Sequence, residues 1–242
     1  MKAFVKKIVP QAVIVRSKIV LSYAHHVLKG SFFKLVSLKN KSLEHGFSLQ
    51  LVEKQEIKPG ALFENKWHNI QLTASKISNI VIPQGGIFSF WHLVGNPSQR
   101  NGFKESRMIR NGQLGFEVGG GVCQVSSLVY LAALQAGMTI LERHNHSVDI
   151  YQEDERFAPL GADATVVYGT KDFQFVNNLD SDIQLIINVL GNEITLTLLS
   201  KLPIQKRALH FDRYEENARR IVKTMAERDG KWEELFVSVY KI

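Results

Sequence analysis

The sequence predicts an α+β fold in which one apolar helix is embedded among antiparallel strands. The run VCQVSSLVYLAALQAG (122–137) has apolar residues at spacings of three and four and ends at a glycine, which is typical of a helix with one buried face. Farther along, DIQLIINVL and EITLTLLS flank Gly191-Asn192, a β-hairpin pattern. The chain has 242 residues, of which 45% are hydrophobic, so it is long enough to bury a sizeable core.

The elements are expected in the following order. Helices are predicted at 11–38, with a break at Gly30, and at 65–78; a turn at 83–86 leads into a short strand. Residues 105–118 are expected to form two strands about Asn111-Gly112. After the helix at 122–137, strands are expected at 138–143, 146–152, 162–169 and 173–178, then hairpins at 182–200 and 219–242, the last about Asp229-Gly230.

Charge divides the chain into two parts. Residues 1–60 contain 11 Lys and Arg against 3 Asp and Glu, whereas residues 61–242 contain 19 against 20. We therefore expect a basic helical N-terminal extension (1–60) and one domain (61–242) that ends in β-hairpins. A basic amphipathic segment favours an anionic membrane surface as its partner. A merely solvated face explains the same charges equally well, and no nucleic-acid partner is expected.

Neither a transmembrane helix nor a secretory signal is recognisable. The most apolar early run, IVPQAVIV (8–15), is short, contains Pro10 and Gln11, and is followed by Arg16. The expected location is cytoplasmic or peripheral to the inner face of the membrane, with a role in the cell envelope. The single cysteine excludes an intrachain disulfide and a Cys-rich zinc site.

That cysteine, Cys123, directly follows three glycines at the predicted start of a helix. The N-terminus of a helix offers unpaired backbone N–H groups and the positive end of the macrodipole, both of which favour a reactive thiolate. Backbone N–H groups at Gly120 and Gly121 are expected to form an oxyanion hole. The alternative is that Cys123 is a small buried hydrophobic residue without a chemical role.

A cysteine nucleophile needs a base and a group that orients the base. His146 lies 23 residues after Cys123, and Asp163 lies 17 residues after His146. A nucleophile on a helix, a histidine on the next strand and an acid on the strand after it is the order used by papain- and transglutaminase-type folds.

Other residues near this pattern are auxiliary candidates. His144 is an alternative base, Gln124 an oxyanion donor, and Arg143 a ligand for a substrate carboxylate, as are Arg107 and Arg110. Glu142 and Asp172 are alternative orienting acids. The His144-x-His146 pair is also compatible with a metal site, but spacing offers no obvious third ligand. We expect no metal and no cofactor.

Several segments together resemble one known family. FSFWHLVGNPSQRNGF (88–103), GGGVCQVSSLVYLAALQAGM (119–138), ERHNHSVDIY (142–151), GADATVVYG (161–169) and DFQFVNN (172–178) look like the successive motifs of the VanW family. The resemblance covers about residues 60–200. It is carried most specifically by the glycine–cysteine–glutamine segment, R-x-x-H-S and G-x-D-A.

The resemblance implies cysteine-dependent acyl transfer or amide hydrolysis on a cell-wall (peptidoglycan-type) peptide or precursor, similar to an L,D-transpeptidase. The matching nucleophile is Cys123, the histidine is His146, and the acid is Asp163. The alternative function is a non-catalytic, cell-wall or membrane-associated binding module.

Overall fold

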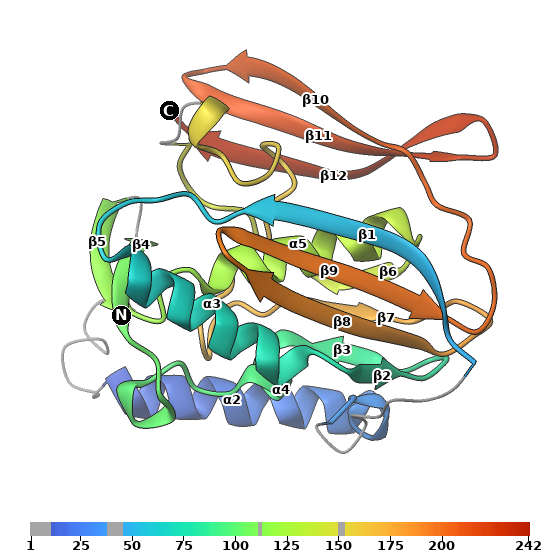
Figure 1. The fold of residues 1–242 in the computed structure, drawn as a ribbon, viewed down its shortest axis with the longest axis horizontal. Helices are drawn as coiled ribbons and strands as arrows, with labels where there is room; N and C mark the ends of the chain where they lie inside the picture. Colours follow the sequence, from blue (N-terminus) through green and yellow to red (C-terminus); the bar gives the residue numbers. More distant parts are fainter. Residues whose placement is uncertain (1–10, 38–45, 111–112, 150–152) are drawn as a thin grey trace.

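A computed structural model describes residues 11–37, 46–110, 113–149 and 153–242. In this part of the chain, helices are combined with antiparallel strands (Figure 1). The helices and short 3-10 turns are α2 (Gln11–Leu28), η1 (Phe32–Lys34), α3 (Phe63–Ile77), α4 (Phe90–Val94), η3 (Gln99–Asn101), α5 (Val122–Gln135) and η4 (Glu153–Glu155). The strands are β1 (Ser48–Glu56), β2 (Ile80–Ile82), β3 (Ile87–Ser89), β4 (Glu105–Arg110), β5 (Gln113–Val118), β6 (Thr139–Glu142), β7 (Gln174–Val176), β8 (Ile183–Leu190), β9 (Glu193–Ser200), β10 (Leu209–Glu216), β11 (Arg219–Arg228) and β12 (Lys231–Lys241).

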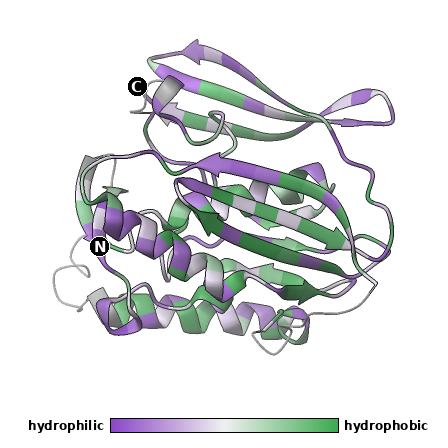
Figure 2. Cartoon of the chain, in the orientation of Figure 1, coloured by the Kyte–Doolittle hydropathy of each residue, from purple (hydrophilic) through white to green (hydrophobic). Residues whose placement is uncertain are grey.

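The central sheet is antiparallel and has the order β1-β9-β8-β2. Its middle is the predicted hairpin of β8 and β9, which pair from Ile183↔Ser200 to Leu190↔Glu193 about Gly191 at φ 55°. Apolar residues run along β8 (Figure 2), and the side chains of Ile183, Leu185 and Ile187 are buried. Helices α3 and α5 both contact this sheet, and they also contact each other. The sheet therefore fixes the helix that bears Cys123.

The segment predicted as a helical extension contains a strand of this sheet. β1 (Ser48–Glu56) pairs antiparallel with β9 along its length. The first predicted helix is present as α2 and ends at Leu28, just before Gly30 at φ 65°. Figure 1 shows α2 along one edge of the molecule, and its Val20, Leu21 and Leu28 are exposed. Among the described residues, no helix is long and apolar enough to cross a membrane.

Two predicted strands next to the cysteine helix are wrong. Within 146–149 and 162–169 the chain is irregular, apart from single bridges at Val148 and Val167. The segment at 162–169 is held by side chains of α5 instead of a strand ladder: Ser126 Oγ donates to the Ala164 carbonyl (2.5 Å), and Ala164 N–H donates to Ser127 Oγ (2.9 Å). This arrangement places the segment across the first turns of α5.

The C-terminal residues form a separate antiparallel sheet, β10-β11-β12 (Figure 1). The hairpin predicted about Asp229-Gly230 is confirmed, and both turn residues have positive φ. β10 was not predicted; it is joined to β11 by Asn217 and Ala218, which also have positive φ. The end of β12 pairs with the segment after β6, because Lys241 exchanges backbone hydrogen bonds with Ser147 and Asp149.

Each of the three glycines before Cys123 has a steric reason. Gly119 and Gly121 have φ values of 92° and 97°, a region that side chains rarely adopt. Gly120 has ordinary φ but no room: a Cβ atom there would lie 2.6 Å from the Arg107 carbonyl oxygen and 2.7 Å from that of Ser106. The glycines let the loop lie directly against β4 before it enters α5.

Replacing Gly120 tests this close packing. In Gly120→Ala the methyl group meets backbone atoms that cannot rotate away, so we expect the free energy of unfolding to fall by about 2–3 kcal/mol. Gly115→Ala, in the adjacent strand β5, is the control, because a Cβ atom there meets nothing within 4 Å. Urea unfolding of both variants measures the difference. Equal stabilities of the two variants would contradict the packing argument.

Candidate active site

Cys123, His146 and Asp163 come together at the first turn of α5. Cys123 is in this turn, His146 follows β6, and Asp163 belongs to the irregular segment held by α5. His146 interacts with both Asp163 and the Cys123 side chain. Cys123 and His146 line a cavity of about 290 Å³. The structure thus brings together the three residues proposed from the sequence.

Asp163 is the most heavily bonded residue of this group. Its Oδ2 accepts hydrogen bonds from the backbone N–H of His146 (2.6 Å) and from His146 Nδ1 (2.7 Å). Its Oδ1 accepts from the Tyr240 hydroxyl (2.5 Å) and from Arg143 Nη2 (3.1 Å). Because Nδ1 of the ring donates to the carboxylate, Nε2 is the nitrogen left to interact with the thiol.

The electrostatics favour a charged acid and a charged histidine. Burial alone raises the pKa of Asp163, but hydrogen bonds from His146 and the charges of His146 and Arg143 outweigh it and hold that pKa well below its ordinary range. Burial alone lowers the pKa of His146, but its hydrogen bonds to Asp163 and Cys123 raise it to about 10. An imidazolium therefore lies beside the Cys123 thiol at neutral pH.

Ser126 and Ser127 of α5 join the backbone of Cys123 to Ala164, the residue that follows Asp163. Ser127 Oγ donates to the Cys123 carbonyl (2.7 Å) while accepting from Ala164 N–H (2.9 Å). On the same side, the Cys123 thiol is 3.6 Å from the Val166 carbonyl oxygen. The serines that follow the cysteine thus fix the separation between nucleophile and acid.

Two backbone N–H groups at the end of the glycine loop, next to the thiol, make no hydrogen bond to the described part of the chain. Among the described residues, none accepts a hydrogen bond from the backbone N–H of Cys123 or Gly121. Gly121 lines the cavity, whereas Gly120 is packed behind it and its carbonyl accepts from Asn69. The amide of Gln124 donates to the Glu56 carbonyl (2.9 Å) and is therefore committed to the fold. The N–H groups of Gly121 and Cys123 are the best-placed oxyanion donors.

Arg143, considered above as a ligand for a substrate carboxylate, is bonded to Asp163 instead. Its side chain is 4% exposed and donates to the carboxylate of Asp163, the Gly161 carbonyl (2.9 Å) and Ser238 Oγ (2.6 Å). The guanidinium also lies over the Tyr130 ring, 5.1 Å from its centroid. Arg143 orients Asp163 and is too enclosed to bind a substrate carboxylate.

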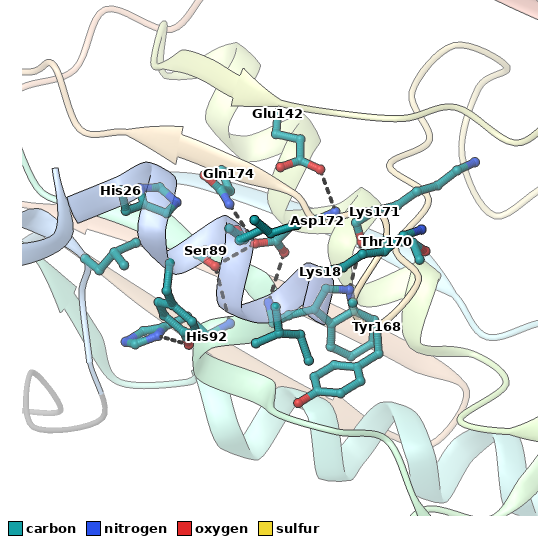
Figure 3. A pocket seen from close by; sticks show the side chains of 17 residues that line it. Lys18, His26, Ser89, His92, Glu142, Tyr168, Thr170, Lys171, Asp172 and Gln174 are labelled. Atoms are coloured by element: carbon teal, nitrogen blue, oxygen red, sulfur yellow. Dashed lines mark hydrogen bonds between the residues drawn. The ribbon is translucent and has the colours of Figure 1, made fainter. Parts of the chain in front are cut away.

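The other acids and His144 lie apart from the thiol. His144 Nε2 is bonded to Glu142 (2.9 Å), and His144 does not line the cavity of Cys123. Asp172 belongs to a second cavity, of about 440 Å³, beneath α2 (Figure 3). There it accepts from Ser89 (2.6 Å) and Gln174 (2.9 Å), both of which point toward it in Figure 3. Among the described residues, no hydrogen bond joins Asp172 to His146, so the structure does not bring it together with the histidine it was considered to orient.

The two histidines of the H-x-H pair bond to different acids, Glu142 and Asp163. Among the described residues, no group of three or more His, Cys, Asp and Glu side chains is placed to hold a metal ion. Of the predicted arginines, Arg107 lines the cavity, and the side chain of Arg110 lies outside the described residues.

Sequence reasoning missed the residues that complete the site from a distance. Tyr240 and Ser238 come from β12, about 80 residues after Asp163, and no local pattern connects them to it. Lys66 on α3 lines the cavity and was overlooked within a helix of ordinary composition. The alternation of Ser238 and Tyr240 on one face of a strand was the available signal, because it places both toward the same neighbour.

A comparison with known families matches residues 65–199, more than half of the chain, to the family described as VanW like protein. The chain belongs to the VanW-like family. The resemblance found in the motifs is thereby confirmed. No solved structure matches this VanW-like chain.

Two curated relatives are similar to part of this chain. The uncharacterized protein YoaR of Bacillus subtilis (strain 168) is 35% identical over 144 residues, which are 60% of this chain and 46% of YoaR. The vancomycin B-type resistance protein VanW of Enterococcus faecalis (strain ATCC 700802 / V583) is 32% identical over 131 residues, 54% of this chain and 48% of that protein. The chain therefore spans about half the length of the curated relatives it matches.

The raised pKa of His146 predicts a pH dependence of stability in this VanW-like chain. The folded-state pKa of about 10 lies above the ordinary 6.5, so the contribution of His146 is complete below about pH 6.5 and is lost as the pH rises toward 10. The unfolding free energy of the wild type should decline relative to His146→Gln by about 1 kcal/mol per pH unit in this window. Urea unfolding at pH 6, 8 and 10 measures it. The control is His210→Gln, on the exposed surface of β10, whose unfolding free energy should change with pH in parallel with that of the wild type. If the unfolding free energy of His146→Gln also changed in parallel with the wild type, the charge pairing would be refuted.

Thiol reactivity tests the same pairing directly. Iodoacetamide reacts with thiolates, so alkylation of Cys123 in the wild type should persist well below about pH 8.5, the ordinary thiol range. In His146→Ala the rate should rise only near that range, because the imidazolium is gone. The measurement is the alkylation rate against pH by intact mass. Superimposable profiles of the two proteins would show that Cys123 and His146 are not a reactive pair.

Proposed function

We propose that this protein is a cysteine acyltransferase or amidohydrolase that acts on cell-wall peptide. The observation that carries the proposal is the line of contacts from the Cys123 thiol through the His146 ring to the buried Asp163 carboxylate. A structural cysteine needs no such partners, whereas a nucleophile requires both a base and a group that orients the base.

The first half of the reaction forms an acyl-enzyme. The Cys123 thiolate attacks the carbonyl carbon of an amide, and the oxygen becomes an oxyanion that the N–H groups of Gly121 and Cys123 stabilise. The tetrahedral intermediate then collapses: the C–N bond breaks, and His146 gives its proton to the leaving amine. The products of this half are a thioester on Cys123, a free amine and a neutral imidazole.

The second half releases the acyl group. The neutral His146 accepts a proton from an attacking nucleophile, which adds to the thioester carbonyl and expels the Cys123 thiolate. An amine acceptor gives a new amide, which is transpeptidation, and water gives hydrolysis. Asp163 keeps Nδ1 protonated throughout, so Nε2 exchanges the proton in both halves.

Two observations support a peptide from the cell wall as substrate. The cavity is lined by apolar residues, which include Phe63, Phe157 and Val166, together with Lys58 and Lys66, and this mixture suits a peptide. In addition, one relative is named a vancomycin B-type resistance protein, which agrees with the cell-wall substrate that the family resemblance implies. An activity similar to that of an L,D-transpeptidase fits the acyl-enzyme chemistry.

The test is acyl-enzyme formation on muropeptides. Wild-type protein incubated with a muropeptide should gain the mass of the acyl group, and Cys123→Ala should gain none and lose at least about 10³-fold in turnover. Intact-mass spectrometry and chromatography of the muropeptides measure the two effects.

Ser75→Ala is the control variant, because Ser75 is exposed on α3 and does not line the cavity. It should retain wild-type turnover, and thermal unfolding should show that Cys123→Ala is folded. Full activity in Cys123→Ala would rule out the proposed nucleophile.

A further inference from the structure

The cavity of Cys123 contains a lysine for which the proposed chemistry has no use. The stem of Lys66, from α3, passes beside the glycine loop: a Cβ atom on Gly121 would lie 2.9 Å from Lys66 Cγ. The absence of a side chain at Gly121 therefore leaves room for the stem of Lys66, which lines the same cavity as the thiol. Its Nζ donates to a neutral acceptor, the Lys58 carbonyl (3.3 Å).

The charge of Lys66 is not balanced within the fold. Among the described residues, no carboxylate forms an ion pair with Lys66. Burial, followed by repulsion from Arg107, lowers its pKa to about 8. Of the described residues that line the cavity, three are Lys or Arg and one, Glu155, is acidic. Lys58, the other lysine of the lining, is paired with Glu56 (2.6 Å), so an anion that binds in the cavity would stabilise the half-buried ammonium group of Lys66.

Two buried polar atoms of residues that line the cavity also lack a hydrogen-bond partner in the described part of the chain. Gln124 Oε1 and Thr165 Oγ1 have no hydrogen-bond partner among the described residues, although their residues are only 1% and 8% exposed. Both residues line the same cavity as Cys123. Burying such atoms without partners is costly, so a ligand that bonds to them recovers that cost. The amide oxygen accepts from a peptide N–H, and the hydroxyl donates or accepts.

We propose that Lys66 binds a carboxylate of the acyl donor, so that the preferred substrate is a peptide with a free carboxylate close to the bond that Cys123 attacks. The proposal rests on the function proposed above, because it takes the Cys123 cavity as the place where the donor binds. Gln124 Oε1 accepts a hydrogen bond from a backbone N–H of the same peptide, and the Thr165 hydroxyl forms a hydrogen bond with a neighbouring polar group of that peptide. Lys66 selects the donor and takes no part in proton transfer.

A pair of matched alkylating reagents tests this selection without any knowledge of the substrate. Iodoacetate carries a carboxylate where iodoacetamide carries a neutral amide, and both alkylate the same thiol. The measured quantity is the ratio of their alkylation rates at Cys123 at pH 7. In Lys66→Met we expect the iodoacetate-to-iodoacetamide ratio to fall by about tenfold, the contribution of one charged hydrogen bond. Lys66→Arg should keep most of the wild-type ratio.

The control is Lys104→Met, which removes an exposed lysine that does not line the cavity and should leave the ratio unchanged. An unchanged ratio in Lys66→Met, with a thiol that still reacts rapidly, would overturn the role of Lys66 and leave the proposed nucleophile intact. An equal fall in Lys104→Met would also overturn it, because the effect would then be one of net charge. A thiol that reacts slowly with both reagents in the wild type would remove the proposed function and this inference together.

The same preference should appear in turnover. A muropeptide donor with its free carboxylate should be preferred over the same donor amidated at that carboxylate, and Lys66→Met should abolish the preference mainly through KM. A wild type that uses both donors equally would contradict the inference while leaving the acyl transfer established.

Discussion

The carboxylate of Asp163 is the point at which three separate parts of the chain meet. One oxygen accepts from the backbone and the ring of His146, and the other accepts from Tyr240 and Arg143. The segment that carries Asp163 has no strand ladder of its own, so these bonds and the serines of α5 determine its position. If the carboxylate were lost, the imidazole, the arginine and the phenol would each lose the partner that orients it.

Burying charged groups costs free energy, and the structure limits this cost by pairing the Asp163 carboxylate with Arg143 and His146. Arg143 is 4% exposed and is bonded to a carboxylate, two carbonyl oxygens and a hydroxyl, so its donors are well satisfied. Burial and the charge of Asp163 raise the pKa of Tyr240, which keeps the phenol a hydrogen-bond donor. Apolar residues would fill this space at less cost in free energy, so the cluster is better explained by chemistry than by stability.

Much of this arrangement follows from local sequence patterns, and the rest does not. Helix α5 was predictable because its apolar spacing and terminal glycine are local, and the β8–β9 and β11–β12 hairpins were predictable from their turn residues. β10 was missed because its turn uses Asn217-Ala218, and alanine rarely adopts positive φ. The strand expected around Asp163 is absent because side-chain bonds to α5 replace the ladder, whereas the segment at His146 bonds to the Asp163 carboxylate and, through its backbone, to Lys241. Alternation in sequence does not distinguish these cases from a strand. The comparison with papain- and transglutaminase-type folds stays a prediction.

The partners of Asp163 also lie on both sides of a boundary in the sequence. The region shared with the VanW-like family ends at residue 199, whereas Ser238 and Tyr240 lie beyond it on β12. The match to the family model therefore leaves out two residues that bond to Arg143 and Asp163. A change at Tyr240 would therefore alter the hydrogen bonds of Asp163, and through them the basicity of His146, without altering the residues around the thiol.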